Sequence, residues 1–159
     1  MTRALVRCEV EVAAPAHVVW EYVTDWPRQA EWIPFTRVQR VDAADGVGGR
    51  IRAWTGFGPV GFWDPMTITS WDVAEDGSAR CEMLHTGAVV RGDAEFAVRS
   101  SGPHACTFVW WEHLDIPGGP VGALGWKAVG GLMAKMVDLS LRRMATRAEM
   151  LAQRATPSV

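Results

Sequence analysis

The sequence predicts an α+β fold, in which a strongly bent antiparallel sheet of about six to seven strands wraps around a long C-terminal helix. Residues 36–113 alternate between apolar and polar side chains and are interrupted by short turn segments, which is typical of strands joined by hairpins. Residues 121–152 instead place apolar side chains at helical spacing. An antiparallel sheet must cover one apolar face, and this helix is the only large element left to do so. Because a bent sheet and a helix cannot close on each other completely, we expect a cavity between them.

The N-terminal residues predict a strand followed by two short helices. In residues 5–13, valines and a cysteine alternate with charged side chains, which is the pattern of a strand with one buried face. Pro15 suits the first turn of a helix, where its missing N–H leaves no hydrogen bond unmade. Trp26-Pro27 is expected to end that helix, and a second short helix is predicted over residues 28–32.

Length and composition fit a single domain that spans residues 1–159. A hydrophobic content of 48% supplies enough apolar side chains for a sizeable core. Sixteen Lys and Arg stand against eighteen Asp and Glu, which gives a net charge of −2. No excess of cations is therefore available to neutralise a phosphate backbone, and we expect no nucleic-acid partner.

The three cysteines show no metal-binding spacing, and no two histidines share a predicted helix or strand face at ligand spacing. We therefore predict no metal and no cofactor. No signal peptide is visible, and no stretch reaches the roughly 18 apolar residues that a membrane helix needs. These observations predict a cytoplasmic protein without stable membrane insertion, as a monomer or a homodimer.

One glycine-rich segment has to be weighed against a nucleotide-binding motif. Residues 56–61 read GFGPVG and match the GxGxxG of dinucleotide-binding folds. That site needs a helix that begins within the motif, whereas Pro59 and the strand pattern after it favour a hairpin loop. A flexible loop of this kind can also gate the mouth of a cavity.

Strand register identifies the side chains that face the interior. A two-residue turn at Asp76-Gly77 pairs Ile68 with His85, and a turn centred on Gly102 pairs Gly92 with Glu112. The strand over residues 90–98 has one apolar and one charged face, and its apolar face must point to the core. Through this pairing, the residues expected on the core face are Asp64, Met66, Ile68, Met83, His85, Phe108, Trp110, Glu112 and Leu114.

Three ionisable side chains, Asp64, His85 and Glu112, are thus expected inside an apolar interior, where buried charge is costly. The same register separates the backbones of His85 and Glu112 by about 12 Å, so a direct hydrogen bond is not expected. They can grip opposite ends of one ligand, or act separately as acid and base. Structural alternatives also exist: His85 as a hydrogen-bonded core or rim histidine, and Asp64 as a strand-end residue that reaches solvent.

Several segments of the chain resemble a known superfamily. They are residues 13–20 (AAPAHVVW), 24–27 (TDWP), 32–34 (WIP), 48–52 (GGRIR), 71–72 (WD) and 107–110 (TFVW). They are similar to the START/Bet v 1-like (SRPBCC) superfamily and its polyketide cyclase/dehydrase-like branch. The resemblance implies the helix-grip fold, with a cavity between sheet and C-terminal helix. Members include polyketide aromatase/cyclases and carriers of lipids and hormones, and they share no catalytic set that can be carried over.

The first functional hypothesis is a protein that binds a small hydrophobic ligand of aromatic or polyketide-like kind. Polar contacts are expected from His85, Glu112, Asp64 and Arg52. The strand parity of Trp54 and Trp63 is ambiguous. The expected apolar walls are Trp54, Trp63, Met66, Met83, Phe96, Phe108, Trp110, Met133 and Met136.

Two alternatives remain. One is an enzyme that resembles polyketide cyclases and dehydratases, with His85 or Glu112 as the catalytic group that carries protons and no metal or cofactor. The other is a protein-interaction module whose cavity is filled by its own tryptophan side chains. The sequence contains nine tryptophans, enough for either a cavity wall or a plug.

Overall fold

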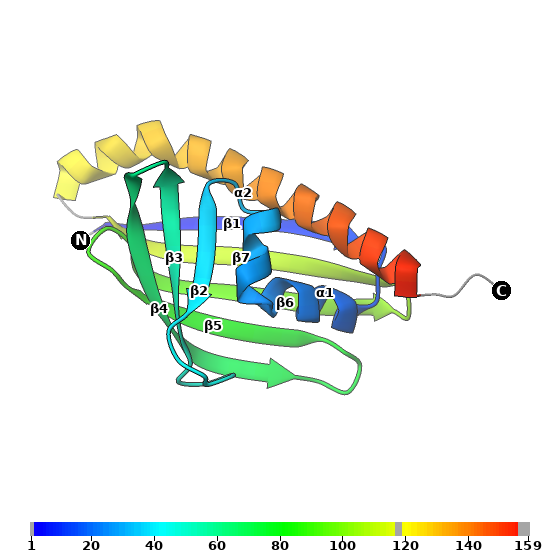
Figure 1. Cartoon of the computed structure of the whole chain (residues 1–159). Coiled ribbons are helices and arrows are strands. Elements are labelled where there is room, and N and C mark those ends of the chain that lie inside the picture. Colours follow the sequence, from blue (N-terminus) through cyan, green and yellow to red (C-terminus); the bar gives the residue numbers. More distant parts are fainter. Residues whose placement is uncertain (1, 117–118, 156–159) are drawn as a thin grey trace.

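The structure is a computed structural model that describes residues 2–116 and 119–155. Each element lies close to its expected place along the chain (Figure 1). The elements in chain order are β1 (Thr2–Val12), α1 (Ala16–Thr24), the 3-10 helix η1 (Trp26–Glu31), β2 (Thr36–Arg40), β3 (Arg50–Phe57), β4 (Val60–Val73), β5 (Ala79–Thr86), β6 (Arg91–Gly102), β7 (Ala105–Ile116) and α2 (Gly119–Ala155).

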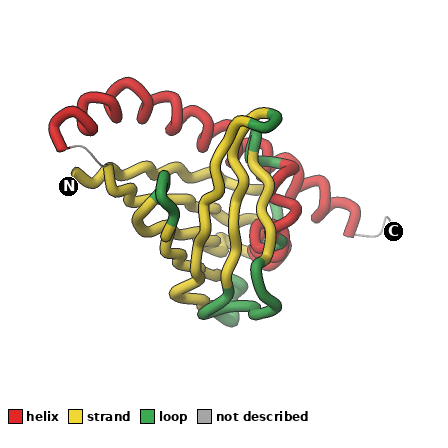
Figure 2. The backbone as a smooth tube through the Cα atoms, turned by 60° about the vertical axis from the view of Figure 1, so that its left-hand side comes forward, coloured by secondary structure: helices red, strands yellow, loops and turns green. Residues whose placement is uncertain are grey.

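The strands form one seven-stranded antiparallel sheet in the order β1-β7-β6-β5-β4-β3-β2. Figures 1 and 2 show β2, β3 and β4 standing steeply across the other strands, so the sheet is strongly bent. A register shift in the long strand β4, between Ile68 and Ser70, supplies a bulge at which such a strand can bend. The predicted helix-grip architecture is confirmed.

The long helix α2 packs with its second half against the sheet and α1, and passes along β1 (Figure 1). Val137, Leu141 and Met144 are buried there at successive turns of its inner face. Deeper in the interior, the Trp32 ring packs against Phe96 and Phe108. No helix of the described chain combines the length and hydropathy needed to cross a membrane.

The second short helix begins earlier than expected. The first helix ends before Trp26-Pro27 as predicted, but the second begins at Trp26 rather than at residue 28, with Pro27 in the first turn of η1. The N–H of Arg28 donates to the carbonyl of Asp25, which starts the new turn at once. A proline has no N–H to donate and is favoured at the start of a helix, so it begins this one as well as ending α1.

The strand register differs from the prediction by two residues in two hairpins. His85 pairs with Met66 rather than Ile68, and Phe96 pairs with Trp110 rather than Phe108. In the β4–β5 hairpin the turn accounts for one residue of the difference and the register shift after Ile68 for the other. In the β6–β7 hairpin the turn moves the register by three residues, and the shift between Ser100 and Gly102 takes one of them back. Side chains alternate between the two faces of a strand, so a register difference of two residues does not change the face of any side chain. Every side chain predicted to face the core therefore does so.

Candidate ligand cavity

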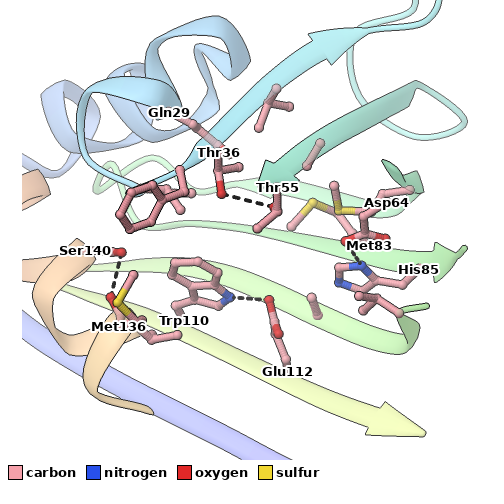
Figure 3. Close-up of a pocket in the computed structure, with 18 of the residues that line it drawn as sticks. Gln29, Thr36, Thr55, Asp64, Met83, His85, Trp110, Glu112, Met136 and Ser140 are labelled. Carbon is pink, nitrogen blue, oxygen red and sulfur yellow. Dashed lines mark hydrogen bonds and ion pairs between the residues drawn. The ribbon is translucent and has the colours of Figure 1, made fainter. Parts of the chain in front are cut away.

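A cavity of about 390 Å³ lies between the inner face of the sheet, η1 and the middle of α2 (Figure 3). Its walls are largely apolar and include nine of the residues expected to contact a ligand. These nine are Asp64, Met66, Met83, His85, Phe96, Trp110, Glu112, Met133 and Met136. The cavity is open inside, so it is not plugged by tryptophans as the interaction-module alternative requires.

Three expected contacts lie on the outer face of the sheet instead. β3 turns Ile51, Ala53 and Thr55 inward, which places Arg52 and Trp54 outside, with Trp63 opposite Trp54 on β4. The Arg52 guanidinium lies 4.4 Å above the Trp63 ring, and the two indoles are 5.4 Å apart between centroids. The strand parity of Trp54 and Trp63, ambiguous in the sequence, thus places both side chains outside the cavity wall.

Phe108 is also absent from the lining. Its side chain is fully buried and packs against Phe96, with 5.4 Å between ring centroids, and against Trp32. The two-residue difference in the β6–β7 register explains this, because it makes Trp110 rather than Phe108 the cross-strand partner of Phe96 and pairs Phe108 with Val98. Phe108 belongs to the core behind the cavity.

The sequence did not identify the part of the wall that η1, the segment between η1 and β2, and strands β2 and β3 supply. These side chains include Gln29, Ile33, Phe35, Thr36, Val38, Ile51, Ala53 and Thr55. The alternation in Thr36–Arg40 and Arg50–Phe57 marks an inner face in each strand. Both strands are short and carry arginines, however, and no turn fixes their register from the sequence alone.

His85 and Asp64 form a buried pair in the cavity wall. The Nδ1 atom of His85 lies 2.8 Å from Oδ2 of Asp64 (Figure 3). Since His85 is opposite Met66, Asp64 is its diagonal neighbour on the same face. Burial lowers the pKa of His85, but the hydrogen bond and the negative charge of Asp64 outweigh burial and hold this pKa above its ordinary value. The expectation that Asp64 escapes to solvent is wrong, because its side chain is buried.

Each member of this pair has one atom left over. His85 Nε2 and Asp64 Oδ1 are buried and have no hydrogen-bond partner among the described residues. When Nδ1–H of a neutral imidazole donates to the carboxylate, Nε2 carries a lone pair and accepts. Asp64 Oδ1 is therefore an unmatched acceptor beside the cavity, and His85 Nε2 is a second acceptor while the imidazole is neutral and a donor once it is protonated.

Glu112 is buried on β7 and faces Ala94, rather than Gly92 as predicted. The indole Nε1–H of Trp110 donates to its Oε1 over 3.0 Å (Figure 3). Burial raises the pKa of the Glu112 carboxyl, and this effect outweighs the opposite influence of His85 and Trp110. Glu112 lies two strands and one side-chain row from His85, a separation that the sequence predicted.

Four further polar side chains of the wall have partners within the protein. The hydroxyls of Thr36 and Thr55 bond to each other over 3.1 Å, and the Gln29 amide donates to the carbonyl of Val23 over 2.9 Å. The Ser140 hydroxyl donates to the carbonyl of Met136 within α2. No arginine or lysine is among the described residues of the lining.

The cavity reaches the surface between the start of β2 and α2. Phe35 and Leu132 belong to its lining and are nevertheless 61% and 63% exposed. The Phe35 backbone has a φ of 58°, rare for a residue with a side chain, and its carbonyl accepts the N–H of Gly56. The ring of Phe57, at the tip of the β3–β4 hairpin, contacts Phe35 with 6.3 Å between centroids. The GFGPVG segment is thus a hairpin, as predicted, and lies beside the mouth.

The bent sheet, the long C-terminal helix and the cavity between them define a START/Bet v 1-like protein. The chain belongs to the polyketide cyclase/dehydrase and lipid transport family, whose model matches residues 3–149. The predicted superfamily and branch are therefore confirmed. No curated protein sequence matches the chain at a significant level.

Solved structures show the same fold at low sequence identity. The Zhui aromatase/cyclase from Streptomyces sp. R1128 is 16% identical with a TM-score of 0.75, and the match covers 99% of this chain and 100% of that one. TTHA0849 from Thermus thermophilus is 18% identical with a TM-score of 0.76, over 94% and 99% of the two chains. Human STARD10 is 11% identical with a TM-score of 0.70, over 95% and 67%. At these identities the likeness establishes the fold alone.

Proposed function

We propose that this protein binds a small, largely apolar molecule in the cavity between sheet and α2. The observation that carries the proposal is the lining itself: an apolar enclosure of about 390 Å³ with three ionisable side chains on its wall. Ligand sites typically have roughly this volume, mostly apolar walls and a few polar groups that orient the ligand. The family description, which names lipid transport beside cyclase and dehydrase activity, is consistent with this reading.

The binding proposal is tested with an apolar aromatic probe and a pair of variants of β6. Ala94→Phe fills the cavity from its wall, whereas Ala97→Phe adds the same ring on the opposite face of the strand. We expect Ala94→Phe to weaken binding of 2-naphthol at least about tenfold, or about 1.4 kcal/mol, and Ala97→Phe to change it less than about twofold. Equilibrium dialysis measures both. Unchanged affinity in Ala94→Phe would place the binding site elsewhere.

A second candidate function is proton-transfer catalysis of the cyclase or dehydratase kind. The His85–Asp64 pair favours it, because a carboxylate on Nδ1 orients the ring and leaves Nε2 available as a base. Glu112, whose pKa is raised by burial, is suited to act as the acid. In this reading His85 takes a proton from an acidic carbon or hydroxyl of the ligand, and Glu112 gives one to the oxygen that leaves as water.

Kinetics of conservative variants separate the two functions. For an enzyme, His85→Asn and Glu112→Gln should each lower turnover about 10²-fold or more while the affinity for substrate changes little. Polyketide-derived ketones that cyclise or dehydrate are the substrates to assay. Equal losses of turnover and affinity would contradict a catalytic role and leave the two residues as ligand contacts.

A further inference from the structure

The hydrogen-bonding balance of the cavity wall specifies the polar group of its ligand. Three donors on the wall are engaged internally: Trp110 by Glu112, Gln29 by the Val23 carbonyl, and Ser140 by the Met136 carbonyl. Of the buried side-chain atoms without a partner among the described residues, Asp64 Oδ1 and His85 Nε2 belong to the lining, whereas the Trp32 indole Nε1 lies outside it. A ligand that enters therefore meets an acceptor, Asp64 Oδ1, that needs a donor, and His85 Nε2 is a second such acceptor while the imidazole is neutral.

The charge balance points the same way. Asp64 and Glu112 are both carboxylic acids, and His85 is the only basic side chain among the described lining residues. Any positive charge on His85 is already paired with Asp64 at 2.8 Å. A carboxylate or phosphate ligand would lose its hydration and gain no unpaired cation in return.

Resting on the proposed function, we infer that the cavity selects an apolar ligand whose polar end is a hydrogen-bond donor, a hydroxyl or an amine, and rejects anionic ligands. The donor would lie against Asp64 and His85 from one side. Glu112 would lie on the other side, with one of its oxygens already engaged by Trp110. Free fatty acids and phosphorylated ligands are thereby excluded as physiological cargo.

Four probes with one naphthalene body test this inference in the unmodified protein: naphthalene, 2-naphthol, 2-(aminomethyl)naphthalene and 2-naphthoate. By equilibrium dialysis at pH 7, we expect the naphthol or the amine to bind about tenfold more tightly than naphthalene, since a hydrogen bond to a charged buried group is worth at least that. We expect naphthoate to bind about tenfold more weakly than naphthalene. A tighter naphthol indicates a neutral donor, and a tighter amine indicates a cation that ionises Glu112; both support the inference.

Variants locate the preference on the two acids. Asp64→Asn and Glu112→Gln keep the side-chain shape but replace an acceptor oxygen with an N–H donor. Each should reduce the ratio of naphthol to naphthoate affinity about tenfold or more. Glu82→Gln, which removes a carboxylate from the outer face of β5, should leave the ratio within about twofold. Unfolding midpoints establish that each variant is folded, and the probe series on the unmodified protein stands without them.

The outcomes distinguish a failure of this inference from a failure of the proposed function. If none of the four probes binds, or if Ala94→Phe does not weaken them, the cavity-binding function fails and the inference fails with it. If all four bind with equal affinity, or naphthoate binds most tightly, the cavity binds apolar ligands but the donor preference is wrong. An unchanged affinity ratio in both acid variants overturns the assignment to Asp64 and Glu112.

Discussion

The two halves of α2 bury their inner faces in different ways. In the second half, Leu141, Met144 and Ala148 are at most 1% exposed and pack into the core. In the first half, Met133 and Met136 are only partly buried and face the cavity, while Leu132 is 63% exposed. One continuous helix therefore packs into the core with its second half and covers the cavity with its first half.

This difference shows that the cavity does not result from a lack of apolar side chains on α2. Methionines occur on the inner face of both halves, but Met133 and Met136 of the first half line the cavity together with side chains of β2, β3 and β4. The bend in the sheet carries these strands away from the core. Packing density thus changes along one helix because its partner changes, and variants of the two halves should differ accordingly.

The largest expected effect compares two methionines of α2. Met144→Ala should lower the free energy of unfolding by about 2–5 kcal/mol, because it leaves a void in a closed core. Met136→Ala should cost less than about 1 kcal/mol, because its side chain already borders an empty space. Denaturant unfolding at constant pH measures both. Equal losses of unfolding free energy would mean that the cavity is filled by side chains in solution, and that the two halves of α2 do not differ in packing.

The next effect depends on pH and involves Glu112, on the β7 side of the cavity wall. The folded-state pKa of Glu112 is raised above its ordinary value of 4.5, so the folded protein holds a proton that the unfolded chain releases. Stability from this group is therefore greatest below pH 4.5 and falls as pH rises toward the folded pKa. Glu112→Gln should stabilise the protein at pH 7, by about 1.4 kcal/mol for each pKa unit, and have no effect near pH 4. A destabilised variant at pH 7 would contradict this picture.

A smaller effect separates two neighbouring glycines in the first half of α2. A Cβ on Gly131 would meet nothing within 4 Å, so Gly131→Ala should stabilise the helix by about 0.5–1 kcal/mol. A Cβ on Gly130 would lie 2.9 Å from the Trp126 ring, so Gly130→Ala should gain less or lose stability. Thermal unfolding of the two variants gives the comparison. Equal gains would show that the helix here makes no close side-chain contact.

An effect of similar size is expected away from α2, on the outer face of the sheet. Arg52→Gln removes a cation 4.4 Å from the Trp63 ring and should cost about 0.5–1 kcal/mol, the usual range for an exposed pair of this kind. The affinity for 2-naphthol should stay within about twofold. A large loss of affinity would place the outer face in the binding site, against the structure.

The fold was predictable because its signals are redundant. The face of β6 follows from apolar alternation alone, and the long helical period of α2 leaves one element to cover the sheet. The turns were less accurate: Asp76-Gly77 was expected to be closed by Glu75 and Ser78, whereas the ladder begins with Val73 and Ala79. That difference did no harm only because the bulge after Ile68 restored the parity.

The site was predictable in composition but not in its central contact. Asp64, His85 and Glu112 were expected inside, and all three are buried. Their pairing depends on register, however: opposite Ile68, His85 would have been two rows from Asp64, and opposite Met66 it is one row away. A two-residue difference that leaves every face unchanged still decides which polar groups touch.

The hydrogen bond from the Trp110 indole to Glu112 gives the protein an internal optical reporter. The excited state of an indole is strongly dipolar, so its emission shifts when a charge appears near the ring nitrogen. Ionisation of Glu112 places a negative charge 3.0 Å from that nitrogen. The difference in emission between the protein and a Trp110→Phe variant therefore follows the protonation of the cavity's acid, without any attached label.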